Sequence, residues 1–424
     1  MIIFSKKALG VYLFAVLTCL YFLEQGAILA LLLAPMFILN KNWRIVIVLI
    51  TPIVGGGVDN SGAISFELTF GLYVLIFTIP SLLVRPRIPS VASYFLLGLL
   101  LLILGEIVGL INGDNLITTE FITFNGRVLY MIAISYRLSF LENEDILSGL
   151  KFVSTIIPLV IILVVVKMLT DDIRVGLYKN YLNYGSTSHG SFSSYLSFLW
   201  ILYLGFFRTN ERRSYAASIM TLLLGIFCMY AIVLSASKNG MAIFTVMTLL
   251  TLYLTSKRKT GAIGLILFVS FIGLTIFQGI DDNPLLRRFE LSDDITTGRA
   301  DLLLGGIELA SKNIIVGVGN SSSVVRSELY ALTGLDNLSH NVVLEYLIRY
   351  GIAGFLYVAI PMILVLYNFA MLFLTRQHKH TQTAPFLFGV TSVLISSMAI
   401  SYTWSTNLMI PYALYFILNK KSYV

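Results

Sequence analysis

Long uninterrupted apolar runs recur along the chain and constrain its fold more than any other sequence feature. A helix needs about 20 apolar residues to cross the hydrocarbon core of a bilayer, whereas a membrane β-barrel would alternate apolar and polar residues. Only 12% of the residues are charged, against about a quarter in soluble domains. The sequence therefore predicts an all-α fold, a polytopic transmembrane helical bundle.

The runs predict about fourteen spans, or about twelve if neighbouring short runs merge. The expected spans are residues 7–23, 26–39, 43–58, 64–84, 91–111, 122–138, 151–169, 190–207, 215–234, 240–254, 261–280, 352–374, 384–400 and 404–418. We expect three parts, namely N-terminal transmembrane helices over residues 1–280, one large external loop over 281–341, and an amphipathic helix with further transmembrane helices over 342–424.

The large loop has helical patterning of its own. We expect a helix capped by Thr296 or Thr297, with an apolar face made of Leu302, Leu303, Ile307 and Ala310. The segment Val342–Tyr350 is typical of a short amphipathic helix. Its polar face would hold Glu345 and Arg349, one helical turn apart and able to pair.

Charge placement tests this topology. With the N-terminus inside, most of the 29 basic residues fall in loops that are then cytoplasmic. The short external loops and their flanks hold only Arg127, Lys167, Arg174, Lys179 and Lys238. This asymmetry follows the positive-inside rule and places both termini in the cytoplasm. The net charge of +7 therefore indicates membrane topology, and nucleic acid is not an expected partner.

Four polar motifs lie on the predicted external side. They are Asn125-Gly126-Arg127, residues 235–240 (SASKNG), Thr297-Gly298-Arg299 followed by Gly317-Val318-Gly319-Asn320, and Ser339-His340-Asn341. Arginine and lysine side chains bind phosphate groups, and the turn at 317–320 offers backbone amides to an anion. Histidine titrates near neutrality and can accept a proton from a hydroxyl. Together they are sufficient for glycosyl transfer from a diphosphate donor.

Each motif also has a purely structural interpretation. Cations near external helix ends are usually interfacial anchors or topology signals, and a lone histidine such as His340 is more often solvated than catalytic. Glu67 and Glu106 lie near or within apolar runs, where a carboxylate is costly and by default functional. The sequence assigns neither of them a role.

Three stretches, taken in order, carry a family resemblance. They are LSASKNGMAIF at residues 234–244, TTGRADLLLGGIELASKNIIVGVG at 296–319, and SHNVVLEYLIRYGIAGFLYV at 339–358. With the surrounding topology, they resemble the O-antigen ligase and O-antigen polymerase (Wzy-type) superfamily of bacterial membrane glycosyltransferases. The resemblance covers residues 180 to 375 or so, and outside it only hydropathy agrees.

The resemblance implies a glycan donor carried on undecaprenyl pyrophosphate at the periplasmic face of the bacterial inner membrane, so the large loop would be periplasmic. It implies that Arg299 holds the pyrophosphate and that His340 activates the acceptor hydroxyl. Lys238 stands where the family usually has arginine, and lysine keeps the charge but loses the bidentate fork. Arg127 is a further candidate for binding the pyrophosphate. Asn341, Gly317 and Gly319 are candidates for supporting roles, and neither a metal nor a cofactor is implied.

The sequence and the resemblance favour a polymerase that joins lipid-linked repeat units into O-antigen or a related surface polysaccharide. The nearest alternative is an O-antigen ligase that transfers the polymer to the lipid A core, since both would share the donor site. A lipid-linked oligosaccharide flippase is a more distant alternative. The expected partners are the lipid-linked donor, the glycan acceptor, membrane lipids, and the chain-length regulator and flippase of the same pathway.

Overall fold

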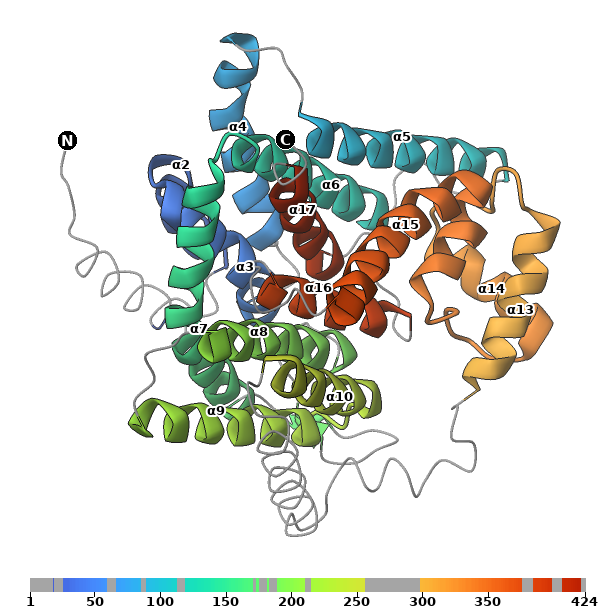
Figure 1. The fold of residues 1–424 in the computed structure, drawn as a ribbon. Coiled ribbons are helices and arrows are strands. Elements are labelled where there is room, and N and C mark those ends of the chain that lie inside the picture. Colours follow the sequence, from blue (N-terminus) through green and yellow to red (C-terminus); the bar gives the residue numbers. More distant parts are fainter. Residues whose placement is uncertain are drawn as a thin grey trace.

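The computed structural model describes residues 18, 26–58, 66–84, 89–112, 119–170, 173–174, 181–182, 189–209, 215–255, 298–375, 384–398 and 406–420. Within these residues the chain forms helices joined by short connections, together with one small antiparallel hairpin (Figure 1). The hairpin consists of β1 (Ile173–Arg174) and β2 (Tyr181–Leu182), with Ile173 opposite Leu182.

Apart from α13 and α14, which lie in the predicted loop, each described helix overlaps a predicted span. They are α2 (Gly26–Leu39), α3 (Lys41–Val58), α4 (Phe66–Val84), α5 (Ser90–Ile111), α6 (Thr119–Leu138), α7 (Asn143–Thr170), α8 (His189–Thr209), α9 (Tyr215–Leu234), α10 (Lys238–Thr255), α13 (Arg299–Lys312), α14 (Ser322–Thr333), α15 (Val342–Thr375), α16 (Ala384–Ser397) and α17 (Thr406–Lys420). The expected spans 7–23, apart from Thr18, and 261–280 lie outside the described residues.

Five of the described helices are long and apolar enough to cross a membrane, at Ser90–Ile111, Glu144–Thr170, Gly190–Phe207, Ala217–Leu234 and Val342–Leu372. Shorter apolar helices accompany them. The prediction of a polytopic helical membrane protein is therefore confirmed.

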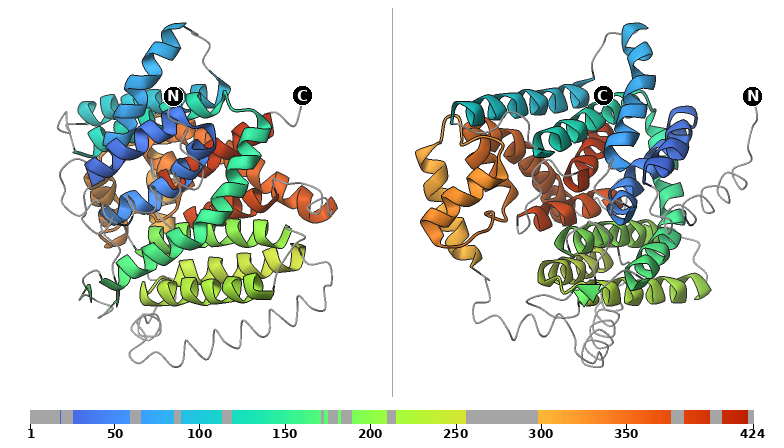
Figure 2. Two further views of the ribbon diagram at one scale, coloured as in Figure 1. Left: turned by 90° about the vertical axis from the view of Figure 1, so that its left-hand side faces the viewer. Right: turned by 180° about the vertical axis from the view of Figure 1, so that it is seen from behind.

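The helices pack in groups around α8. Helix α8 contacts α16, α10 and α7, and α16 also packs against α15 and α17. A second group joins α4, α5 and α6, with α17 against α6. In Figure 1, α8, α9 and α10 lie below α16, and α5 and α6 lie above it; Figure 2 shows the same arrangement from two other sides.

Basic side chains tie together helix ends that the topology places on one side. Arg44 donates to two carbonyl groups in the last turn of α2, at 2.8 and 2.7 Å. Arg137 at the end of α6 donates to Thr78 near the end of α4, at 3.1 Å. Lys41 and Asp145, at the starts of α3 and α7, form an ion pair of 3.1 Å. Cations at helix C-termini bind the unpaired carbonyl groups there.

The described part of the large loop folds over the start of α15. Helices α13 and α14 lie at one side of the bundle beside α15 (Figures 1 and 2). A separate small core joins them through the buried side chains of Leu309, Ala310, Val318, Val325, Leu329, Leu344 and Ile348. The described part of the loop, residues 298–341, is therefore a packed helical cap.

Two details predicted for this region are wrong. Helix α13 buries Leu302, Gly305, Gly306, Leu309 and Ala310, while Leu303 and Ile307 are exposed. The cap of the helix is Gly298, in the left-handed conformation and without a side-chain hydrogen bond, whereas Thr296 and Thr297 lie outside the described residues.

The segment Val342–Tyr350 is not an amphipathic helix at a membrane surface. Its charged side chains, Glu345 and Arg349, are 0% and 1% exposed. They are buried because α13 and α14 pack over this segment. At Gly351 the backbone leaves the helical conformation, with φ 62° and ψ −152°, a region open essentially only to glycine. This bend lies directly before residue 352, where the expected span 352–374 begins.

Candidate functional site

The hairpin that carries Lys238 is shaped by two serines and one unusual backbone position. Ser237 caps α10, because its Oγ accepts a hydrogen bond of 3.1 Å from the N–H of Gly240. Ser193 of α8 donates to the same Oγ at 2.7 Å. Ala236 has a φ of 53°, which is uncommon for a residue with a side chain. The hairpin is thus held in one conformation against α8, with Lys238 as the first residue of α10.

The segment that carries His340 is held in a comparable way. Asn341 caps α15, because its Oδ1 accepts a 3.1 Å hydrogen bond from the N–H of Leu344. His340, directly before the cap, is half-buried and has a φ of 53°. A side chain in this strained region persists only where the surroundings fix it, and such positions cluster at functional sites. The backbone therefore holds the imidazole at the start of α15.

One end of α16 joins these two motifs, which are about a hundred residues apart in the sequence. Asn239 donates from Nδ2 to Oγ of Ser396 at 3.1 Å and to its carbonyl oxygen at 3.4 Å. Asn341 donates from Nδ2 to the carbonyl oxygen of Met398 at 3.3 Å. Each asparagine directly follows the candidate residue of its motif, Lys238 or His340. The structure thus brings both motifs to the same end of one helix.

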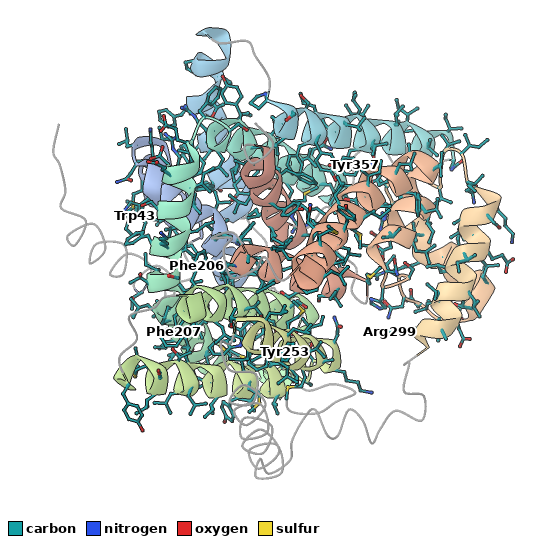
Figure 3. The ribbon with its side chains drawn as sticks, in the orientation of Figure 1. Trp43, Phe206, Phe207, Tyr253, Arg299 and Tyr357 are labelled. Atoms are coloured by element: carbon teal, nitrogen blue, oxygen red, sulfur yellow. The ribbon has the colours of Figure 1, made fainter. Side chains whose placement is uncertain are left out.

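Arg299 is the first residue of α13, in the helical cap. Figure 3 shows it at the lower end of that helix. A Cβ added to Gly298 would lie 2.8 Å from Cδ1 of Leu335. The start of α13 therefore touches the segment that leads, five residues later, to His340.

Both candidate cations occupy the positive ends of helices. Lys238 is the first residue of α10 and Arg299 the first of α13. A helix N-terminus carries about half a unit of positive charge, so a cation there is unfavourable without an anion. Oriented N–H groups at such ends bind phosphates. The Nζ atom of Lys238 is also shielded from solvent. Both positions therefore combine a basic side chain with the positive end of a helix dipole.

The turn at 317–320 has a structural role and does not offer its first three amides to an anion. The N–H groups of Gly317, Val318 and Gly319 donate to the carbonyl groups of Asn313, Ile348 and Arg349, at 2.8, 2.8 and 3.1 Å. A Cβ at Gly317 would lie 2.3 Å from the backbone of Arg349, and one at Gly319 would lie 2.9 Å from the carbonyl oxygen of Gly105. Glycine is needed here because the turn lies directly against α15 and α5.

A buried polar cluster that sequence reasoning missed fixes the cap to the bundle. Arg349 donates to the carbonyl oxygen of Asn320 and, at 2.7 Å, to Oγ of Ser322. Asn320 in turn donates from Nδ2 to the carbonyl oxygen of Leu102 at 2.7 Å and to Oε2 of Glu106 at 3.2 Å. The half-buried Glu106 thus receives a position in a network that links α5, the turn and α15. The charged Arg349, within the mostly apolar segment 342–350, was the sequence feature that could have indicated this cluster.

Two other candidates lie elsewhere. Arg127 stands half-buried on α6, which packs against α4, α5 and α17, whereas Lys238 stands on α10 against α8, α9 and α16. Arg127 therefore belongs to a different group of helices from the hairpin. Glu67 lies in the first turn of α4, and its side chain is outside the described part of the structure.

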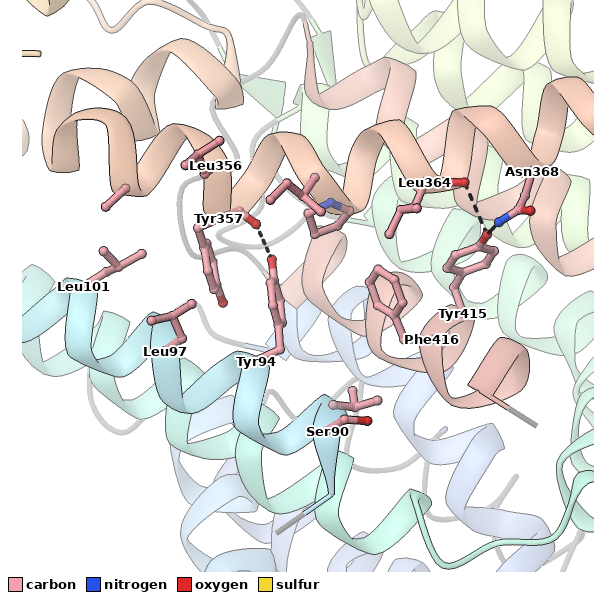
Figure 4. Close-up of a pocket in the computed structure, with 14 residues that line it drawn as sticks. Ser90, Tyr94, Leu97, Leu101, Leu356, Tyr357, Leu364, Asn368, Tyr415 and Phe416 are labelled. Carbon is pink, nitrogen blue, oxygen red and sulfur yellow. Dashed lines mark hydrogen bonds between the residues drawn. The ribbon is translucent and has the colours of Figure 1, made fainter. Parts of the chain in front are cut away.

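An apolar crevice of about 670 Å³ runs along α15 below the cap (Figure 4). Its walls come from α5, α15 and α17, and its lining residues include Leu97, Leu101, Ala353, Leu356 and Phe416. Polar groups along it are used within the protein. Tyr94 donates its hydroxyl to the carbonyl oxygen of Tyr357 at 2.9 Å, and Asn368 donates to the hydroxyl of Tyr415. The remaining surface suits a hydrocarbon chain.

Residues 221–359 match the family model described as O-antigen ligase. The match supports the O-antigen ligase and polymerase superfamily. The matched segment contains Lys238, Arg299 and His340, whereas Arg127 lies outside it. No curated protein sequence matches the chain. The match supports a membrane function of the O-antigen ligase and polymerase type, with a glycosyltransferase-like activity.

Proposed function

We propose that the protein is a membrane glycosyltransferase that polymerises undecaprenyl-pyrophosphate-linked repeat units into O-antigen or a related surface polysaccharide, without a metal ion. The observation that carries the proposal is the shared anchoring of the Lys238 and His340 motifs on the end of α16. It joins a cation suited to a pyrophosphate and a base suited to a hydroxyl. The enzyme would lie in the bacterial inner membrane, with both termini cytoplasmic and the cap periplasmic.

In the proposed reaction, a hydroxyl oxygen of the acceptor sugar attacks the anomeric carbon of the donor glycan. The bond between that carbon and the pyrophosphate oxygen breaks, and the hydroxyl proton passes to the imidazole of His340. Undecaprenyl pyrophosphate leaves with the bonding electron pair. Arg299 and Lys238, each supported by the positive end of its helix, stabilise the negative charge that develops on the leaving group.

The apolar crevice supports a donor that is carried by a lipid. The part of α15 that follows the bend at Gly351 lines the crevice from Ala353 to Asn368, and the part before the bend begins beside His340 and Asn341. A lipid-linked donor with its head group near His340 would therefore place its hydrocarbon chain beyond the bend, along the crevice. Burying apolar surface in this way contributes about 25 cal/mol per Å² where the displaced neighbour is water, and less where it is lipid.

An O-antigen ligase is the second candidate, favoured by the description of the matched family. It would use the same donor site and differ in its acceptor, the lipid A core. A flippase fits less well, because a transporter places its charged residues at a central site between repeated halves. Here the candidate cations Lys238 and Arg299 stand at the N-terminal ends of two different helices, α10 and α13.

The decisive experiment compares glycan ladders from cells that express the wild type, His340→Ala, Arg299→Ala or Lys312→Ala at matched membrane abundance. Lys312 is a suitable control because its ion pair with Glu308 on the same helix is more than half exposed. Loss of long chains with single repeats retained, in the first two variants only, supports the polymerase. Normal ladders in both contradict the proposal. Loss of surface glycan with accumulation of lipid-linked polymer indicates the ligase.

A further inference from the structure

A polar hollow of about 670 Å³ lies on the cap, along α14 and the segment that follows it. Its lining is Ser322, Ser323, Arg326, Ser327, Tyr330 and Asp336. Clefts that hold small ligands usually measure about 300–1,000 Å³. Three serine hydroxyl groups, one cation, one carboxylate and one tyrosine ring line a single cleft of that size. The hollow therefore has the chemistry of a site for a polyhydroxylated ligand.

The two charged side chains in the hollow are open to a ligand. Arg326 and Asp336 are exposed, and neither forms an ion pair with a residue that the structure describes. An ionised carboxylate accepts hydrogen bonds from several hydroxyl groups, and a guanidinium donates up to five. Tyr330 is 57% exposed, so its ring presents a large apolar face at the cleft. A pyranose ring offers hydroxyl groups at its rim and an apolar face of C–H groups, which matches this lining.

The walls of the hollow are held in place by contacts on either side. Ser322 accepts the 2.7 Å hydrogen bond from the buried Arg349, which fixes the start of α14 to α15. At the other end, Gly334 closes α14 in the left-handed conformation, and its N–H donates to the carbonyl oxygen of Tyr330 at 2.8 Å. Asp336 follows two residues later, so its position is set by the end of the helix.

The hollow lies close to the proposed base. Asp336 and His340 are four residues apart, so their Cα atoms are separated by no more than about 15 Å. The segment between them is ordered by hydrogen bonds from the N–H of Asn337 to Leu335 and from the N–H of Leu338 to Asn337, at 2.9 and 3.0 Å. A glycan bound in the hollow would thus lie within a short oligosaccharide's length of the imidazole.

We infer that this hollow is a saccharide subsite, which holds a sugar of the acceptor glycan behind the sugar whose hydroxyl reacts. The inference rests on the proposed transferase function and assigns it an acceptor-binding surface. Tyr330 stacks on a sugar ring, while Asp336 and Arg326 bind its hydroxyl groups. An acidic sugar would bind Arg326 through its carboxylate in the bidentate manner typical of arginine.

The first test measures binding alone. Full-length protein in lipid nanodiscs is mixed with the repeat-unit oligosaccharide, released by mild acid from the lipid-linked intermediates of the same cells, and saturation-transfer NMR is recorded. We expect a signal for the wild type and Tyr330→Phe, which keeps the ring, and at least a fivefold loss for Tyr330→Ala and Asp336→Asn. Glu328→Gln is the matched control, because Glu328 is exposed on α14 but does not line the hollow. Absence of a wild-type signal, or equal signals in all variants, overturns the inference.

The second test separates the subsite from the catalytic proposal. In a transfer assay with purified lipid-linked substrates, Tyr330→Ala should raise the KM for the acceptor about fivefold to tenfold and leave kcat nearly unchanged. His340→Ala should lower kcat instead. An unchanged acceptor KM in Tyr330→Ala overturns the subsite while the transferase stands. Full activity in His340→Ala contradicts the proposed base, whereas the NMR result still decides the subsite.

Discussion

Replacing Gly240 with alanine should destabilise the hairpin that positions Lys238. The added Cβ would lie 2.2 Å from Oγ and 2.4 Å from Cβ of Ser193, and 2.9 Å from Oγ of Ser237. Contacts this short force α8 and α10 apart and break the hydrogen bond between the two serines. Overpacking costs about 1–3 kcal/mol and the lost hydrogen bond about 1 kcal/mol. We therefore expect the free energy of unfolding to fall by about 2–4 kcal/mol.

The loss can be measured by titrating the purified protein with a denaturing detergent and following helical content. Gly334→Ala is a useful comparison, because an added Cβ there meets nothing within 4 Å and only the left-handed backbone, with φ 71°, is strained. That strain costs about 1–2 kcal/mol. The double variant Gly240→Ala with Ser193→Gly removes both of the shortest contacts and should recover most of the packing loss. Unchanged stability in Gly240→Ala, or no recovery in the double variant, would refute the close packing of α8 and α10.

Three further outcomes are expected. Asn341→Ala removes both the cap of α15 and the contact to Met398, so the free energy of unfolding should fall by about 1–2 kcal/mol. Asn341→Ser keeps a capping oxygen but loses the amide donor to Met398, so it should retain most of the stability and still lower chain polymerisation; polymerisation at the wild-type level in Asn341→Ser would contradict the α16 anchor. Lys238→Ala should abolish long glycan chains on a gel, whereas Lys238→Arg keeps the charge and gains a bidentate donor, so its ladder should be retained; a normal Lys238→Ala ladder would exclude the pyrophosphate role. Ala353→Trp fills the crevice. In the purified assay it should lower transfer from an undecaprenyl-linked donor more than transfer from a short-prenyl donor. Equal effects on both donors would show that the crevice holds no lipid chain.

The transmembrane helices were predictable because apolar runs of bilayer length report directly on spans. The boundaries 26–39 and 215–234 agree residue for residue with α2 and α9. Hydrophobic periodicity gave a wrong prediction in the large loop and the segment directly after it, where the chain packs against itself rather than against lipid. Arg349 looked like a surface residue of an amphipathic helix, yet the cap buries it against Asn320 and Ser322. Local spacing contains no information about a distant segment that folds over the helix.

The candidate site was likewise predictable only in part. Lys238, Arg299 and His340 were identified from residue type and order, and the structure adds that two of their motifs share one helix end. That end, Ser396 to Met398, carries no chemical motif of its own and was not identified from the sequence. The amides of the 317–319 turn were predicted to be available to an anion, but the fold uses them for packing. Backbone groups have no sequence signature that would distinguish the two uses.

The anchoring of both motifs on α16 limits how this protein can be rearranged. The matched family segment, residues 221–359, includes Asn239 and Asn341 but neither Ser396 nor the α8 residue Ser193. A chimera that transplanted only this segment into another bundle would leave behind the helices that hold its two motifs together. Exchange of donor or acceptor specificity between such enzymes therefore requires α8 and α16 to be transferred with the recognisable domain. The segment recognisable by its sequence, residues 221–359, is therefore smaller than the set of helices that holds the two motifs together.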